Sequence, residues 1–408
     1  MGNKSELMPV KLIILFLTII GPIGFFSFCA ILGKPYGGSE SSSSYLIYNV
    51  FFCFASLFIV FLDMVRNLRA VNLAYCQAAL ISITYILFFI FQGDGSGARE
   101  AFQQFGVWAI PALFVGVYFS RDFRWKKIWR CADVLMLLLT VNSTSTALIY
   151  LINGYGTASG TGATYQDASY MGAFAFGINL YILASINSEE RLLFAQKRVY
   201  HVLQYALLAV QGVSTFVCGG RGAFVTLMFF LIIYLKMKRQ VGQTIKLSAF
   251  ITIMGAAGYL VVRKLGVQDV LEKGFFRAIS FISASGIEWN HTSGRDIVYA
   301  EAIQSIKEKV LFGRGVFSYR NQYFYPHNFF LEVLIQGGIV YLIIWIVCLG
   351  ILVNKYVRNI RRMPEFGLIG ILATYPCVML MFSGSYMSST LFWFTVGILI
   401  GTKENFAL

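Results

Sequence analysis

The sequence predicts an all-α polytopic membrane protein with about 12 transmembrane helices. Of its 408 residues, 57% are hydrophobic and only 13% are charged, whereas a soluble domain is typically about 25% charged. The apolar residues lie in long continuous runs, and one bilayer-spanning helix needs about 20 of them. Basic residues gather on alternate connecting segments, the pattern that orients a chain in a membrane. A soluble multidomain enzyme, a disordered protein and a secreted disulfide scaffold are excluded.

Twelve apolar stretches are candidate spans. They lie at 12–32, 45–62, 72–92, 102–120, 132–152, 170–187, 199–218, 222–236, 245–262, 328–353, 366–383 and 386–401. Their continuous character favours helices over the alternating strands of a membrane barrel. The first run lacks a small-residue cleavage site, so we expect it to stay as a membrane anchor.

The charge distribution predicts that both termini lie in the cytoplasm. With the N-terminus inside, the cytoplasmic segments hold 21 Lys and Arg residues, and the short outer loops hold only Lys34, Arg99 and Arg221. This asymmetry is a positive-inside signal. The net charge of +14 therefore reports membrane orientation and indicates no nucleic-acid partner.

The chain is expected to form one membrane domain with a long outer loop. Residues 1–262 would hold the first nine helices, 263–327 the loop, and 328–408 the last three helices. Within the loop, 267–283 is predicted to be an amphipathic surface segment. A second helix is predicted over 294–311, with its apolar stripe at Ile297, Ala300, Ile303, Ile306 and Val310. The seven cysteines lie in or near spans and indicate packing, not disulfides or zinc.

Two arginine motifs lie on the predicted outer side. Gly219-Gly220-Arg221-Gly222 joins two spans, and backbone N–H groups beside a guanidinium at a helix start suit phosphate. The alternative is a turn whose arginine reaches lipid headgroups. Arg295 lies in the first turn of the loop helix, where its charge opposes the helix dipole and needs a partner. That partner is either Asp296 or a substrate phosphate.

A third motif, Tyr325-Pro326-His327-Asn328 with Glu332, opens the tenth predicted span. The start of a helix disfavours imidazolium, so His327 is expected to be neutral, the form that a general base requires. Glu332 is one turn after Asn328 and is expected to pair with it. A carboxylate this close to hydrocarbon is a functional candidate. The alternative is an interfacial histidine followed by a capping asparagine.

The order of these motifs resembles a known superfamily. GGRGA, then SGRDIVYAEAIQSIKEKVLFGRG, then YPHNFFLEVLIQGGI is similar to the O-antigen ligase and polymerase superfamily (Wzy and WaaL proteins) over roughly 205–350. One departure lies at Gln166-Asp167-Ala168-Ser169, where family members often carry a sequence like Asp-Pro-Asn. The resemblance therefore implies no role for Asp167.

The resemblance implies a metal-independent glycosyltransferase, without a cofactor, in the bacterial inner membrane and with its site facing the periplasm. Its donor would be a glycan on undecaprenyl pyrophosphate. The family's two arginines and histidine correspond to Arg221, Arg295 and His327. We assign substrate contacts to Gly220, Gly222, Arg314, Tyr325, Asn328 and Glu332, and expect sugar stacking on the aromatics Tyr319, Tyr323, Phe324 and Tyr325.

Three functions are open at this point. A repeat-unit polymerase is favoured because polymerases are more numerous and diverse in the family, and a chain-length regulator would then be a further partner. An O-antigen ligase would transfer the finished glycan to lipid A core or another acceptor. A non-enzymatic transporter of lipid-linked glycan would explain the basic outer loop without needing His327.

Overall fold

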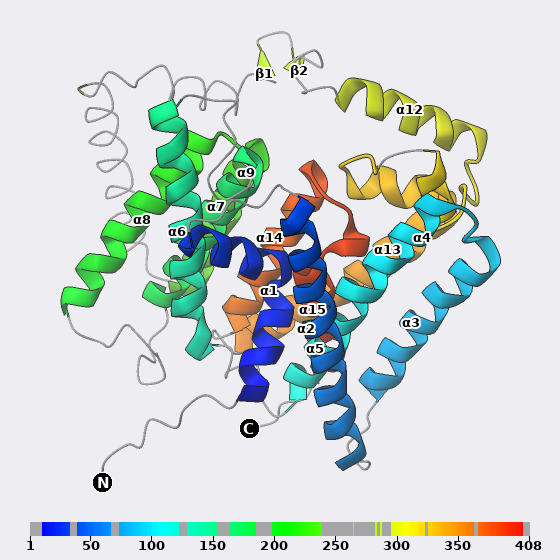
Figure 1. The fold of residues 1–408 in the computed structure, drawn as a ribbon, viewed down its shortest axis with the longest axis horizontal. Coiled ribbons are helices and arrows are strands. Elements are labelled where there is room, and N and C mark those ends of the chain that lie inside the picture. The colour runs from blue at the N-terminus through cyan, green and yellow to red at the C-terminus, as the bar shows by residue number, and fades with distance from the viewer. Residues whose placement is uncertain are drawn as a thin grey trace.

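The structure, a computed structural model, confirms an all-helical chain with several long apolar helices (Figure 1). It describes residues 10–32, 39–66, 73–121, 129–153, 164–184, 198–238, 264, 282–283, 286–287, 295–322, 325–362 and 366–402. The helices before the long loop are α1 (Val10–Ile31), α2 (Ser39–Arg66), α3 (Leu73–Gln92), α4 (Ser96–Gln104), the π-helix η2 (Phe105–Ala109), α5 (Ile110–Ser120), α6 (Trp129–Asn153), α7 (Tyr165–Ala184), α8 (Arg198–Cys218) and α9 (Arg221–Lys238). The later ones are α12 (Arg295–Glu308), the 3₁₀-helix η5 (Ser318–Asn321), α13 (Phe329–Arg362), α14 (Gly367–Phe382), the 3₁₀-helix η7 (Tyr386–Ser388) and α15 (Thr390–Gly401).

Five of the described helical segments are long and apolar enough to cross a membrane, or six if the bent α1 is one span. They are 43–66, 73–92, 96–120, 132–152 and 329–360. The chain is therefore a multi-pass membrane protein, but the predicted count of twelve is not confirmed. α8, α9, α14 and α15 contain apolar helical segments of 10–17 residues, and 245–262 lies outside the described residues. The division at 262 and 327 stays a prediction.

Two expectations for the long loop need correction. Ile282 and Ser283, the end of the predicted amphipathic segment, form a two-residue strand, β1 (Ile282–Ser283), which pairs with β2 (Gly286–Ile287). Residues 267–281 lie outside the described part. The second loop helix is confirmed as α12, but it buries Ala302 and Ser305 and leaves Ile297 and Ile303 exposed. The contact face toward Tyr319 and Ile335 combines these small side chains with Ile306, a member of the predicted stripe.

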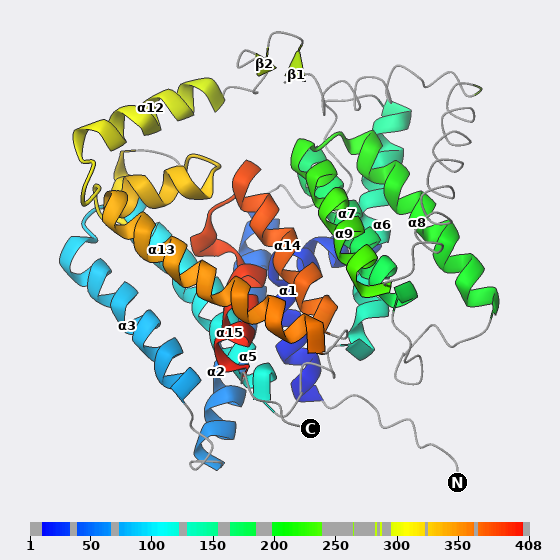
Figure 2. The same cartoon turned by 180° about the vertical axis from the view of Figure 1, so that it is seen from behind.

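α5 and α15 pack closely through glycines. A Cβ atom at Gly116 would collide with the backbone of Phe394, and one at Gly397 would collide with that of Leu113. Such small residues let membrane helices approach each other where no hydrophobic effect drives them together. α5 and α15 are almost wholly buried. α13 contacts both α14 and α15 and crosses in front of them in Figure 2.

α7 forms the centre of a second group of helices with α6, α8 and α9. Its side chains from Ala168 to Ile182 are buried. Polar side chains cross between these helices: the Asn179 amide donates to the Gln204 carbonyl and to Gln211, which in turn donates to Thr140. Interhelical hydrogen bonds of this kind hold membrane helices together and fix the position of α7.

α13 is interrupted at Gly337 and Gly338, whose backbone angles are non-helical. In a continuous helix the N–H groups of residues 339 and 340 would bond the carbonyls of 335 and 336. The loop after α12 replaces both bonds. Ile335 and Gln336 accept from the N–H groups of residues 314 and 315 at 2.7 and 2.8 Å, and the N–H groups of 339 and 340 donate to the carbonyls of 310 and 311 at 2.9 and 3.3 Å. The loop segment 310–315 is thus hydrogen-bonded into the break.

The break predicts an unusual sensitivity at Gly338. Its φ is +64°, and a Cβ atom would collide with the backbone of Leu311. We expect Gly338→Ala to lower the free energy of unfolding by about 2–4 kcal/mol, from backbone strain plus overpacking. Thermal unfolding of the purified protein in detergent measures this.

Gly350 is the matched control, because it lies in the same helix and a Cβ atom there meets nothing within 4 Å. Gly350→Ala should be neutral or gain up to about 1 kcal/mol from helix propensity. Equal unfolding temperatures for the two variants would contradict the backbone docking described above.

Candidate functional site

The start of α9 carries the first predicted motif. Gly219 turns the chain between α8 and α9 with a φ of +68°. The N–H of Gly220 donates to the Ser169 hydroxyl on α7 at 3.0 Å. The sequence predicts that this N–H group is exposed to an anionic ligand, but it is hydrogen-bonded within the protein. A Cβ atom at Gly222 would collide with the Tyr170 hydroxyl. The two glycines therefore bring the start of α9 onto α7, and Arg221 is the first residue of α9. Their contact with a substrate stays a prediction.

The start of α13 carries the histidine motif. The Asn328 side-chain oxygen accepts from the N–H groups of Phe330 and Leu331 at 3.0 and 3.2 Å, which is an N-cap. His327 precedes it with a φ of +54°. Left-handed backbone at a non-glycine residue costs about 1–3 kcal/mol and tends to occur at functional sites. The Tyr325 ring meets the imidazole edge to face, with centroids 4.6 Å apart.

The last turn of α14 brings these two motifs together. The Asn328 amide approaches the Met381 carbonyl at 3.5 Å. The next residue, Phe382, is, with Tyr170, one of the two side chains that a Cβ atom at Gly222 would meet. The helix starts that carry Arg221 and His327 thus contact adjacent residues of α14. Figure 1 shows the start of α9 and the end of α14 at the same face of the bundle, the one across which α12 lies; we call it the α12 face.

α7 also begins at this place. Thr164 and Asp167 form a capping box: the Asp167 N–H donates to the Thr164 hydroxyl oxygen, and the Thr164 N–H donates to the Asp167 carboxylate, each at 3.2 Å. Near the start of α7, the Ser169 hydroxyl accepts the hydrogen bond from the Gly220 N–H, so α7 and α9 begin side by side. The starts of α7, α9 and α13 therefore converge, and each presents the positive end of a helix dipole. Such a place suits an anion.

Arg320, at the end of η5, is a site residue that the sequence reasoning missed. Its guanidinium lies over the Tyr325 ring, 5.1 Å from the centroid, a cation–π contact. Burial raises the pKa of the Tyr325 phenol, and the charge of Arg320 opposes that shift. Tyr325 therefore stays a protonated hydroxyl between a cation and His327. An arginine five residues before a tyrosine gave no sequence signal, because the turn between them sets the contact.

Glu332 is buried, with 1% of its surface exposed. Its carboxylate accepts hydrogen bonds from the Tyr319 hydroxyl at 2.7 Å and from Ser385 at 2.5 Å. The expected pairing with Asn328 is wrong, because the Asn328 side chain is taken up by the N-cap and by Met381. Tyr319 itself is only 1% exposed, so the expected sugar stacking on this ring is also wrong. Burial raises the pKa of Tyr319 well above its ordinary value, which keeps the phenol a donor.

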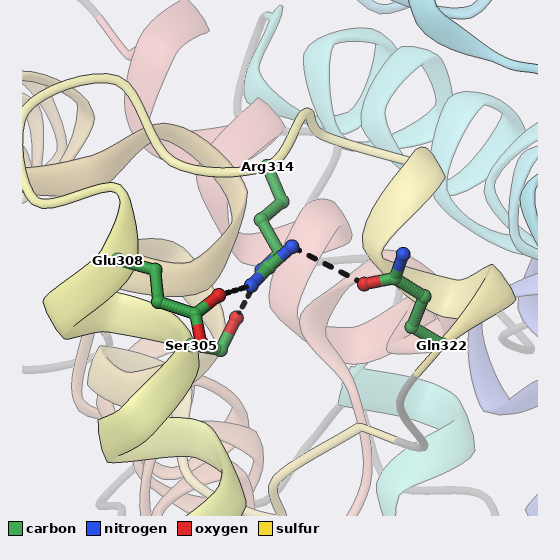
Figure 3. A network of polar contacts seen from close by, with 4 residues as sticks. All are labelled: Ser305, Glu308, Arg314 and Gln322. Carbon is green, nitrogen blue, oxygen red and sulfur yellow. Dashed lines mark hydrogen bonds and ion pairs between the residues drawn. The ribbon is translucent and has the colours of Figure 1, made fainter.

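Arg314 lies at the centre of a polar network between α12 and η5 (Figure 3). Its guanidinium donates to Ser305 at 2.6 Å and to Gln322 at 3.3 Å, and it pairs with Glu308. Ser305 and Glu308 belong to the last turn of α12, so the arginine holds this turn against the loop that leads to α13. These contacts give Arg314 a structural role, and its predicted contact with substrate stays a prediction.

Arg295 is the first residue of α12, as the sequence indicated. Its side chain, together with Tyr323 and Phe324, lies outside the described part of the structure. The expected convergence of Arg295 with Arg221 and His327 therefore stays a prediction.

No protein-family model matches the chain, and no curated protein is significantly similar to it.

The hydrogen bonds to Glu332 predict a stability effect at Tyr319. Tyr319→Phe removes one donor from a buried carboxylate, and we expect a loss of about 1–3 kcal/mol in the free energy of unfolding. Chemical or thermal unfolding in detergent measures it. Tyr205→Phe, the same change at a tyrosine that is 38% exposed, is the control and should shift stability by less than about 0.5 kcal/mol. A Tyr319→Phe variant as stable as this control would show that the hydroxyl does not support Glu332.

The network of Arg314 predicts a local effect on α12. Arg314→Lys keeps the charge but loses the planar set of donors, so the last turn of α12 should open more often. Amide hydrogen exchange over 295–308 is expected to quicken by about tenfold, mostly from the bonds to Ser305 and Gln322, since the pair with the half-exposed Glu308 contributes little. Arg99→Lys, at an exposed arginine on α4, should leave that exchange unchanged. Equal exchange in both variants would rule out the structural role.

Proposed function

We propose that this chain is a glycosyltransferase that uses a glycan linked to undecaprenyl pyrophosphate, as the resemblance to the O-antigen ligase and polymerase superfamily implies. The observation that supports it is the contact of the last turn of α14 with both Gly222 and Asn328. It supports the proposal because Gly222 and Asn328 are the sequence neighbours of Arg221 and His327, which lie far apart in the sequence. The convergence of three helix starts there suits a pyrophosphate group.

In the proposed reaction, His327 accepts the proton of an acceptor sugar hydroxyl. The hydroxyl oxygen then bonds to the anomeric carbon of the donor sugar, and the bond from that carbon to the phosphate oxygen breaks. Arg221 and Arg295 stabilise the negative charge that grows on the departing pyrophosphate, an effect that is largest in a site of low dielectric constant. No metal or other cofactor takes part in the proposal. The membrane would be the bacterial inner membrane, with the α12 face toward the periplasm.

The favoured activity is polymerisation of repeat units. A ligase that transfers the finished glycan to lipid A core or another acceptor is the second candidate, and a non-enzymatic transporter of lipid-linked glycan is the third. The strained backbone of His327 and its contact with Tyr325 favour the two enzymes, because a transporter needs no oriented imidazole.

Reconstitution with undecaprenyl-pyrophosphate-linked repeat units tests the proposal. The wild-type protein should lengthen the glycan into a ladder of products. We expect His327→Ala to lower the rate by about 10²–10⁴-fold, and Arg221→Ala or Arg295→Ala by about 10²–10³-fold each, with normal protein levels.

His291→Ala and Arg99→Ala are the matched controls, since neither residue is assigned to the site, and both should keep full activity. Transfer of one finished glycan to a lipid A core acceptor, without lengthening, would identify the ligase. Movement of the lipid-linked glycan across the bilayer without any new glycosidic bond, unchanged in His327→Ala, would refute the enzymatic proposal.

A further inference from the structure

The segment Val310-Leu311-Phe312 between α12 and the break in α13 exposes three consecutive apolar side chains. Their exposed fractions are 41%, 59% and 75%. Contiguous apolar surface on a folded protein marks contact with another apolar body. The segment is also rigidly placed, because the carbonyls of Val310 and Leu311 accept hydrogen bonds from the backbone of α13.

The place of this segment identifies the apolar body. Its two partners in α13, Ile339 and Val340, are the first residues after the break and are themselves about 40% exposed. From there α13 continues as a candidate membrane span with exposed Ile343, Ile344 and Val347. The exposed apolar side chains of the segment thus adjoin those of α13 where the candidate span 329–360 continues after its break.

The lysines beside the segment fit a position at the boundary between the lipid headgroups and the hydrocarbon. Lys307 and Lys309 are exposed and directly precede it, while Glu308 between them is paired with Arg314. Lysines at the boundary of the hydrocarbon extend their ammonium groups to lipid phosphates. An apolar surface flanked by lysines is typical of segments that lie in the interfacial region.

We propose that residues 307–312 anchor the long loop in the membrane, with Val310, Leu311 and Phe312 among lipid hydrocarbon chains and with Lys307 and Lys309 at the headgroups. The exposed stripe of α12, with Ile303, lies on the helix that leads into this anchor. α12, which runs across the α12 face in both views (Figures 1 and 2), is then fixed at the membrane surface from its C-terminal end. This proposal is independent of the proposed glycosyl transfer.

Photo-crosslinking in nanodiscs of phosphatidylcholine and phosphatidylglycerol tests the anchor. The full-length protein carries p-benzoylphenylalanine in place of Phe312, and mass spectrometry identifies the adducts after illumination. The same replacement at Gln322, an exposed residue on the other side of the Arg314 guanidinium (Figure 3), is the control. We expect lipid adducts at position 312 to exceed those at 322 by about tenfold or more, because the free energy of burying a Phe-sized side chain keeps the ring at 312 among lipid chains, where its ketone meets lipid C–H bonds.

A second variant tests the lysines. Lys307→Gln with Lys309→Gln should leave adducts at position 312 but remove any excess of phosphatidylglycerol over its share of the bilayer. The anchor is refuted if positions 312 and 322 give equal lipid yields, if 312 gives none, or if its adducts join it to another protein chain. An unchanged phosphatidylglycerol excess in the double variant would refute the role of the lysines.

Discussion

The break in α13 is the constraint on which the α12 face depends. A helix interrupted in or near a membrane exposes N–H and C=O groups that lipid cannot satisfy. Here four such groups are bonded by the segment 310–315, and the exchange is possible only because glycine stands on both sides. Gly338 and Gly313 each have a left-handed backbone and each would clash if it carried a Cβ atom. The backbone of the loop segment 310–315 therefore completes the hydrogen bonding of α13.

The hydrogen bonds between the segment 310–315 and the break in α13 position α12, which precedes the segment, and η5, which follows it. Toward the N-terminus, Arg314 secures the last turn of α12. Toward the C-terminus, η5 brings Tyr319 to the buried Glu332 and Arg320 to Tyr325. The contact of Arg320 with Tyr325 helps to fix the position of the tyrosine ring that lies against His327. A backbone contact far from the candidate histidine thus determines which groups surround it.

Arg314 and Glu332 are two predicted substrate-binding residues whose side chains bond other groups of the protein. Both residues are predicted to contact substrate, and for Glu332 the reason is that a carboxylate near hydrocarbon is a functional candidate. The structure supplies a partner for each within the protein. His327 and Arg221 lie next to the place where three helix starts meet and where the dipoles favour negative charge.

The sequence alone determined the helical membrane class, the places of most helices and the order of the arginine and histidine motifs. Hydropathy and turn chemistry are local properties, so they are legible without a fold. It did not determine the number of spans, because the shorter helices fall below the length that crosses a bilayer. It predicted the buried face of α12 only in part: Ile306 packs on the cluster with Tyr319 and Ile335, but Ala302 and Ser305 complete that face, and Ile297 and Ile303 are exposed. Only the tertiary structure decided the partners of Glu332 and the place of Arg320, because those contacts join segments whose separation in sequence carries no periodic signal.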